Sequence, residues 1–414
     1  MNLCRTCPNW AHVANRARTV RKSVLSLNTS LLLSVGLLVS TAASVMAQQS
    51  SLQEDALAEL GRELFFDTAL SNTGTQACAS CHDPDRAFID SRTVSSLAPL
   101  SLGSDGVSLG SRNAPTLSYA ALVPDLELDE SGLYVGGLFH DGRASNLEAQ
   151  ASVPLLHPKE MAMASEDAVL ERLLGNSRYV VAFGELFGAA ALQDAESAVD
   201  QFSEAIAAFE RSDFFAPFDS KYDRYLRGEY TPTVKEQVGM GLFFSPAFTS
   251  CNQCHQLPNG SDTKREVFSN FRYENIGLPA NIALNIKSNT STELIDEGLS
   301  ANLLLADVAE EDLLAQRGKF RVSTLRNVAI TAPYMHNGIF KDLRTVLLFY
   351  NKYNSTNVQA QTNPETQADW GPPEVSDNID TDKLKSVFLV ERQIDALMAF
   401  LYMLTDARYE HLLP

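Results

Sequence analysis

The chain has 414 residues, of which 45% are hydrophobic and 20% are charged. This composition argues against a disordered chain, and the length favours two domains. With 33 Lys and Arg against 51 Asp and Glu, the formal net charge is −18. That charge argues against nucleic acid as a partner, because phosphate binding needs a basic surface.

Residues 1–47 have the pattern of a secretory signal peptide. Basic residues end at Lys22, and an apolar run of small residues follows from Leu31 to Val45. Val45 and Ala47 fit the −3 and −1 positions of a cleavage site. An uncleaved membrane anchor is the alternative, but the run is short for a membrane span. We therefore expect cleavage after Ala47, export to the periplasm and a mature chain that is not embedded in the membrane.

Four of the six cysteines lie in two Cys-x-x-Cys-His strings, the pattern to which c-type haem is attached. The strings consist of Cys78, Cys81 and His82, and of Cys251, Cys254 and His255. Each thiol pair bonds the vinyl groups of one haem, and the adjacent His binds its iron. A zinc site with four Cys ligands is the alternative, but zinc does not require a His after each pair. We expect two covalently bound haems and no disulfide.

Similar segments precede the two haem strings. Gly61 to Asp67 and Gly239 to Ser245 each end an amphipathic stretch with helical spacing. The repeated order of helix, loop and haem string predicts two cytochrome c-like haem domains in tandem. Between them, residues 195–209 have the pattern of a long helix. We place the first haem domain at residues 48–215 and the second at residues 216–414.

Loop residues dominate two further segments, 95–110 and 354–380, which are rich in Ser, Gly, Pro and Asp. Little of the chain alternates between apolar and polar residues over useful lengths, as half-buried strands would. The sequence therefore predicts a mainly α fold with long irregular loops.

Six further strings lie in a fixed order around the haem strings. They are 112–116 (RNAPT), 139–144 (FHDGRA), 147–151 (LEAQA), 158–161 (PKEM), 324–328 (TLRNV) and 331–338 (TAPYMHNG). In these strings the chain resembles the bacterial di-haem cytochrome c peroxidase family, which includes the MauG-type enzymes. Each string alone is weak, but their order together with two haem strings is specific, and the resemblance covers essentially the whole mature chain.

The resemblance implies a peroxide site at the first haem. Glu160 matches the acid/base carboxylate over the peroxide-binding iron, where a carboxyl can move a proton between the two peroxide oxygens. Gln150 matches a polar neighbour of that pocket, and Pro154 matches a residue that crowds it. No His lies between His82 and His140, which favours an open iron at this haem. The alternative for Glu160 is a solvated acid at the start of a helix.

A calcium ion between the haems is also implied. Asn113, Thr331 and Pro333 match the positions that supply its oxygen ligands, and calcium accepts backbone carbonyls as well as side-chain oxygens. The alternative is ordinary turn residues, since Asn and Pro are common in turns.

Two positions depart from the usual family pattern. His140 stands where the family usually has a Trp between the haems; an imidazole is harder to oxidise, and it could also bind iron or titrate near neutral pH. At the position of Tyr350, peroxidase members have a Met ligand to the second haem. MauG-type members have a Tyr there, as this chain does. A phenolate stabilises ferric and higher oxidation states, whereas a Met raises the potential. Met335 is the alternative ligand, and a core aromatic is the alternative role for Tyr350.

The resemblance therefore implies a periplasmic peroxidase that reduces H2O2 to water with electrons from a small donor protein such as a cytochrome c. The acidic net charge fits a basic donor. One alternative is a MauG-like enzyme that oxidises a protein side chain through high-valent iron. The alternative from a different class is a di-haem electron carrier without catalysis, which should not react with peroxide.

Overall fold

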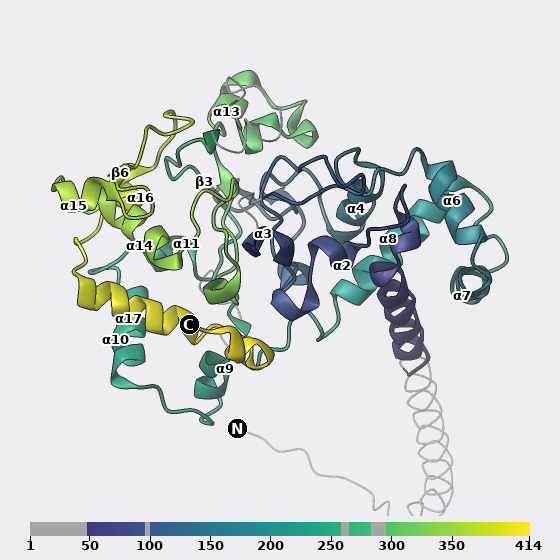
Figure 1. Cartoon of the computed structure of the whole chain (residues 1–414), viewed down its shortest axis with the longest axis horizontal. Helices are drawn as coiled ribbons and strands as arrows, with labels where there is room; N and C mark the ends of the chain where they lie inside the picture. The colour runs from purple at the N-terminus through teal and green to yellow at the C-terminus, as the bar shows by residue number, and fades with distance from the viewer. Residues whose placement is uncertain (1–47, 96–99, 258–264, 283–294) are drawn as a thin grey trace, which may run out of the picture. The chain divides into compact units, whose positions relative to one another are not determined.

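Helices make up most of the regular structure, as Figure 1 shows for this computed structural model, which describes residues 48–95, 100–257, 265–282 and 295–414. The predicted signal peptide, residues 1–47, lies outside the described residues. The helices range from single turns to the 16-residue α8, and their bounds are α2 Cys78–Cys81, α3 Ser91–Ser95, α4 Leu147–Ala151, α5 Val153–Leu156, α6 Glu166–Leu174, α7 Ser177–Phe187, α8 Ala195–Glu210, α9 Lys221–Leu226, α10 Val234–Phe244, α11 Cys251–Cys254, α13 Glu310–Leu314, α14 Leu343–Asn351, α15 Val358–Gln361, α16 Thr381–Leu384 and α17 Glu391–Tyr402. The expected mainly helical fold is confirmed.

Strands are confined to short antiparallel pairs in the part of the chain that the structure describes. They are β1 Glu127–Leu128 with β2 Tyr134–Val135, β3 Tyr273–Glu274 with β4 Phe320–Arg321, and β5 Thr362–Asn363 with β6 Ala368–Asp369. In the second pair, Tyr273 lies opposite Arg321. The predicted loop 354–380 contains α15 and the β5–β6 pair, two small elements that its composition did not reveal.

Residues 57–414 form one compact unit, and residues 48–56, which belong to the other unit, are helical and exposed. No described helix is long and apolar enough to cross a membrane. Within residues 57–414, the buried side chains form two large hydrophobic clusters, one from residues 60–215 and the other from residues 222–404. The predicted boundary after residue 215 falls between these clusters, and it stays a prediction.

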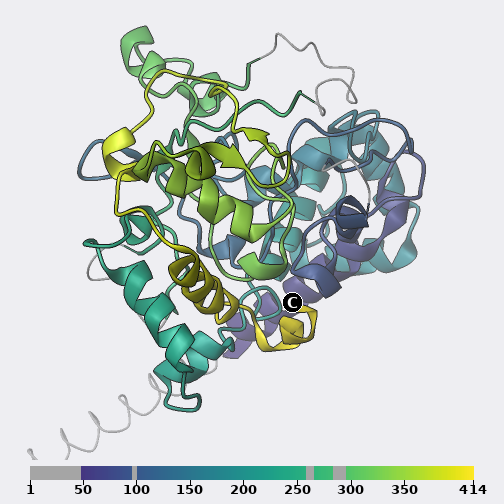
Figure 2. The same cartoon turned by 60° about the vertical axis from the view of Figure 1, so that its left-hand side comes forward.

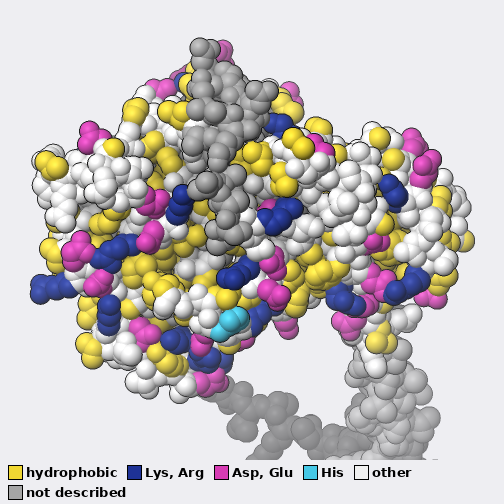
Figure 3. Space-filling view, in the orientation of Figure 1, with side chains coloured by type: hydrophobic (Ala, Val, Ile, Leu, Met, Phe, Trp, Pro, Cys, Tyr) yellow, Lys and Arg dark blue, Asp and Glu magenta, His cyan; other side chains and the backbone are white. Residues whose placement is uncertain are grey.

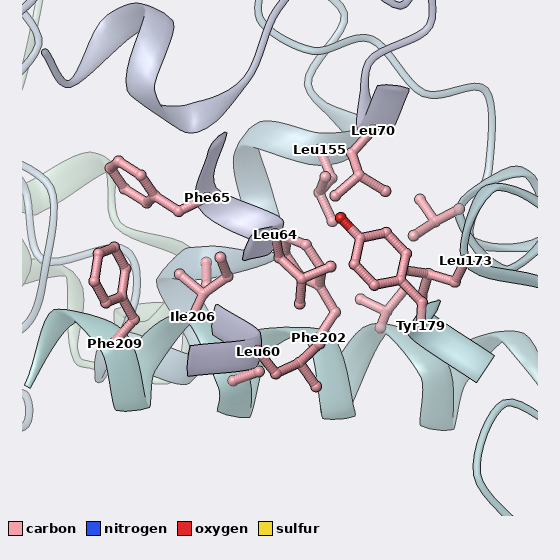
Figure 4. Packing of buried hydrophobic residues seen from close by; sticks show 14 of the residues in the cluster. Leu60, Leu64, Phe65, Leu70, Leu155, Leu173, Tyr179, Phe202, Ile206 and Phe209 are labelled. Atoms are coloured by element: carbon pink, nitrogen blue, oxygen red, sulfur yellow. The ribbon is translucent and has the colours of Figure 1, made fainter. Parts of the chain in front are cut away.

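The first cluster is built where the helical residues 57–66 cross α8. Figure 4 shows Leu64 and Phe65 lying beside Phe202, Ile206 and Phe209. The rings of Phe65 and Phe209 meet edge to face, with centroids 5.5 Å apart. A Cβ atom at Gly61 would lie only 1.9 Å from the carbonyl oxygen of Ala205. The two helices therefore cross in direct backbone contact, which only glycine permits here.

The second cluster repeats this crossing with α10 and α17, which lie side by side in Figures 1 and 2. A Cβ atom at Gly239 would lie 1.8 Å from the carbonyl oxygen of Ala396, and Phe243 meets Phe400 with ring centroids 5.0 Å apart. The similar segments that precede the two haem strings thus build the same contact twice. The two similar sequence segments therefore pack against a second helix in the same way.

Candidate functional site

Each haem string begins with a single helical turn, α2 in one case and α11 in the other. The amide N–H of His82 donates to the carbonyl of Cys78 at 2.9 Å, and that of His255 donates to Cys251 at 2.8 Å. The four cysteines form no disulfide. Among the residues that the structure describes, no three His, Cys, Asp or Glu side chains are placed to hold a metal ion together. These residues therefore build two separate strings and no four-Cys zinc site.

Both histidines of the haem strings are oriented by a backbone carbonyl. Nδ1 of His82 lies 3.0 Å from the carbonyl oxygen of Phe88, and Nδ1 of His255 lies 3.1 Å from that of Phe268. Because a carbonyl only accepts, Nδ1 carries the proton and Nε2 is left with a lone pair for a metal. Burial lowers the pKa of both rings, that of His255 to about 4. The donor set fits haem iron, which takes a neutral imidazole.

A large cavity lies at the second haem string, lined by Cys251, Cys254, His255, Met335 and Tyr350. Burial, assisted by the charges of the two thiols, raises the pKa of the Tyr350 phenol. The hydroxyl of Tyr350 has no hydrogen-bond partner among the described residues, so it is available to a bound group. Both ligands considered from the sequence thus reach one cavity together with the haem-attaching residues.

Glu160 lies near the first haem string, in the turn that follows α5 and not at the start of a helix. Its backbone carbonyl accepts from the amide of Ser104 at 2.8 Å, and its carboxylate lies 3.4 Å from Nδ1 of His157. Burial raises the pKa of Glu160 against the opposing charges of His157 and Arg143. Burial also raises the pKa of Cys81 to about 11, with a contribution from the Glu160 charge. The Glu160 carboxyl therefore lies close enough to the first haem string for its charge to affect the pKa of Cys81. It also holds a proton more readily than a fully exposed Glu.

The other two residues assigned to the peroxide pocket lie on the preceding helices. Gln150 is half-buried in α4, and Pro154 is at the second position of α5. The carbonyl of Pro154 accepts from the amide of Met161, directly after Glu160, at 3.1 Å. Pro154 thus fixes the turn that carries the carboxylate, while the role of Gln150 stays a prediction.

His140 is held by hydrogen bonds on both sides. Its Nε2 donates to the carbonyl of Asn113 at 3.0 Å, and its own carbonyl accepts from the amide of Arg321 at 2.8 Å. Burial and the nearby Arg112 charge lower its pKa to about 4. The ring is therefore neutral at pH 7. The structure does not support the alternative that His140 titrates near neutral pH.

The three residues assigned to calcium come together in the same cavity. The side-chain amide of Asn113 donates to the carbonyl of Pro333 at 2.6 Å, and Thr331 lines the same cavity. Turning the Asn113 amide would place two oxygens side by side, which are hard ligands of the kind that calcium prefers. The residues fit the ion, and calcium itself stays a proposal.

Sequence reasoning missed the carbonyls of Phe88 and Phe268 and the side chain of Arg321. The two carbonyls come six and thirteen residues after their histidines, so no fixed spacing marks them. Arg321 belongs to no recognisable string, and its position in the cavity depends on the β3–β4 pairing.

Comparisons with known proteins agree with the presence of two haem strings. A family model described as di-haem cytochrome c peroxidase matches residues 55–231. The methylamine utilization protein MauG of Paracoccus denitrificans is 48% identical over 89% of this chain and 93% of its own length. The cytochrome c551 peroxidase of Nitrosomonas europaea is 31% identical over 78% of this chain and 80% of its own.

A solved structure shows the same similarity in three dimensions. The diheme peroxidase BthA of Burkholderia thailandensis superposes with a TM-score of 0.77 at 33% identity, covering 86% of this chain and 88% of that one. Together with the relative at 48% identity, this shows that the chain belongs to the di-haem cytochrome c peroxidase and MauG family.

Proposed function

We propose that this protein is a periplasmic, MauG-like di-haem enzyme that uses H2O2 to oxidise a side chain of a protein substrate. The observation that carries the proposal is Tyr350, which lines the cavity of the second haem string together with Cys251, Cys254 and His255. A phenolate ligand stabilises oxidised iron and therefore suits a site that withdraws electrons from a substrate. The 48% identity to MauG supports the same conclusion.

The chain supplies the attachment, the orientation and the proton transfer. Cys78 and Cys81 would hold the first haem, and its iron would supply peroxide binding and redox chemistry. The Phe88 carbonyl fixes the His82 ring with Nε2 free for the iron. Glu160 takes a proton at its carboxylate from one peroxide oxygen and returns it to the other. Its raised pKa brings proton gain and proton loss closer in energy, which favours this exchange.

The imidazole of His157 lies beside the carboxylate, with Nδ1 3.4 Å from Oε1 of Glu160. Its side chain is 38% exposed and that of Glu160 is 28% exposed, so both side chains reach solvent. Asn113, Thr331 and Pro333 would hold calcium between the two haem strings, and Gln150 would provide a polar contact in the peroxide pocket.

A second candidate is the reduction of H2O2 to water with electrons from a small donor protein. The 31% identity to a cytochrome c551 peroxidase favours it, and His140 in place of the family's usual Trp counts against a close functional copy of MauG. A basic donor is the partner expected from the net charge. Figure 3 shows Lys and Arg interspersed with Asp and Glu on the visible face, without a patch of one sign.

Stopped-flow addition of H2O2 to the diferric holoprotein distinguishes the two candidates. The MauG-like function requires oxidation at both haems without prior reduction, with decay accelerated by a protein substrate. A need to reduce the second haem first would support the donor-dependent peroxidase, and no reaction with peroxide would overturn both enzymes in favour of a carrier.

Tyr350→Phe tests the ligand itself. The variant should change the absorption spectrum of the second haem, whereas Tyr353→Phe, whose hydroxyl donates to the carbonyl of Ile276 at 2.8 Å, should not. Identical spectra for wild type and Tyr350→Phe would contradict the assignment.

A further inference from the structure

Arg321, on β4, is half-buried and lines the cavity of the second haem string. Its Nε atom is buried and has no hydrogen-bond partner. Burial lowers its pKa, and the interaction with Tyr273 opposes that shift. Within the described residues, no carboxylate forms an ion pair with this side chain. Arg321 is therefore a cation without an anion, and burying an unpaired charge is costly.

Two other arginines of the same region show how the chain normally satisfies such groups. Arg326 is fully buried, and both its terminal nitrogens contact Asp223, at 2.5 and 2.9 Å. Arg112 pairs with Asp296 at 2.7 Å and with Asp141 at 2.5 Å. Arg321, by contrast, pairs with no carboxylate among the residues that the structure describes.

The carboxylates that line the cavity are already engaged by other groups. They are Glu274, Asp296, Glu374 and Asp380. Lys383 pairs with Glu274 at 2.9 Å and with Asp380 at 3.1 Å. Asp296 pairs with Arg112, and Glu374 accepts from the amide of Asp296 at 3.0 Å. Among the described residues, none of these four carboxylates pairs with Arg321.

We propose that Arg321 binds a propionate of the haem attached to Cys251 and Cys254. A haem carries two carboxylates, and a guanidinium can bind one of them with two parallel hydrogen bonds. The backbone of Arg321 is also bonded to His140, because the Arg321 amide donates to the carbonyl of His140 at 2.8 Å. Arg321 would thus tie the second haem to the segment that replaces the family's Trp. The proposal rests on the haem site and not on which substrate is oxidised.

The test compares Arg321→Gln, Arg321→Lys and wild type as holoproteins, with Arg317→Gln as a matched control. Arg317 lies four residues away and pairs with Glu297 and Asp377 at the surface. A cation beside a propionate stabilises the reduced haem, so Arg321→Gln should lower the midpoint potential of the second haem. The Lys variant should lie between Gln and wild type, and Arg317→Gln should match wild type.

Resonance Raman spectra provide a second measurement on the resting protein. The propionate bending bands of the second haem should shift in Arg321→Gln and stay unchanged in Arg317→Gln. Unchanged potential and unchanged bands in Arg321→Gln would overturn the proposal. If the Gln variant fails to mature, a crystal structure of the wild-type holoprotein decides, because no haem oxygen within hydrogen-bond distance of Arg321 would also overturn it. All these measurements are made without peroxide, so their outcome is independent of the proposed function.

Discussion

Replacing Gly239 with Ala should disrupt the crossing of α10 and α17 and destabilise the second hydrophobic cluster. The added Cβ would lie 1.8 Å from the carbonyl oxygen of Ala396 and 2.9 Å from Cβ of Phe400. Non-bonded heavy atoms sit about 3.5 Å apart, so the helices would have to separate by more than about 1.5 Å.

That separation would loosen the contact between Phe243 and Phe400, whose ring centroids are 5.0 Å apart. Overpacking a core costs about 1–3 kcal/mol, and lost aromatic packing adds to it. We expect the free energy of unfolding to fall by about 3 kcal/mol or more, measured by urea denaturation of the holoprotein followed by far-ultraviolet circular dichroism.

Gly241→Ala, on the same helix, is the matched control. A Cβ there meets no atom within 4 Å, and the higher helix propensity of Ala should stabilise the protein by up to about 1 kcal/mol. Gly61→Ala should reproduce the destabilisation in the first cluster, because its Cβ would lie 1.9 Å from the carbonyl oxygen of Ala205. The reasoning is refuted if Gly239→Ala and Gly241→Ala unfold at the same urea concentration.

Two further predictions concern Glu160, whose side chain is 28% exposed, and the buried Glu210. Glu160→Gln should slow the reaction with H2O2 by about 10²–10⁴-fold in stopped-flow experiments with haem content unchanged, and a wild-type rate would exclude the proton-transfer role. Because burial raises its pKa, the wild-type rate should rise with pH through a step above the usual Glu range, and this step should be lost in the variant. Burial raises the pKa of Glu210 to about 8, so the folded state keeps a proton that the unfolded state releases above pH 4.5, and stability falls between pH 4.5 and 8. Glu210→Gln should remove this loss, on the order of 4 kcal/mol at pH 8 by urea denaturation; an unchanged pH dependence would contradict it.

Local patterns in the sequence predicted much of the scaffold. Helical spacing placed a long helix at residues 195–209, and α8 runs from Ala195 to Glu210. The segments around Gly61 and Gly239 are similar in sequence, and both glycines lie at a helix crossing. These features depend on short-range spacing, which a sequence displays directly.

The missed features depend on contacts between distant segments. The carbonyl of Phe268 orients His255 only because the chain folds back over thirteen residues. Arg321 faces a cavity only because β4 pairs with β3, some fifty residues earlier. Neither the acceptor nor the unpaired cation has a residue pattern of its own, so only the folded structure shows them.

The region around His140 also shows why a single substitution in a motif does not decide the function. The backbone carbonyl of Asn113 accepts a hydrogen bond from the His140 ring, and the backbone N–H of Asn113 donates to the carbonyl of His336 at 2.9 Å. Burial lowers the pKa of His140 to about 4 and that of His336 to about 3. At neutral pH His140 is therefore an uncharged planar ring with one N–H donor, as an indole would be. What the change from Trp alters is the ease of oxidation, so electron sharing between the haems is the property to measure.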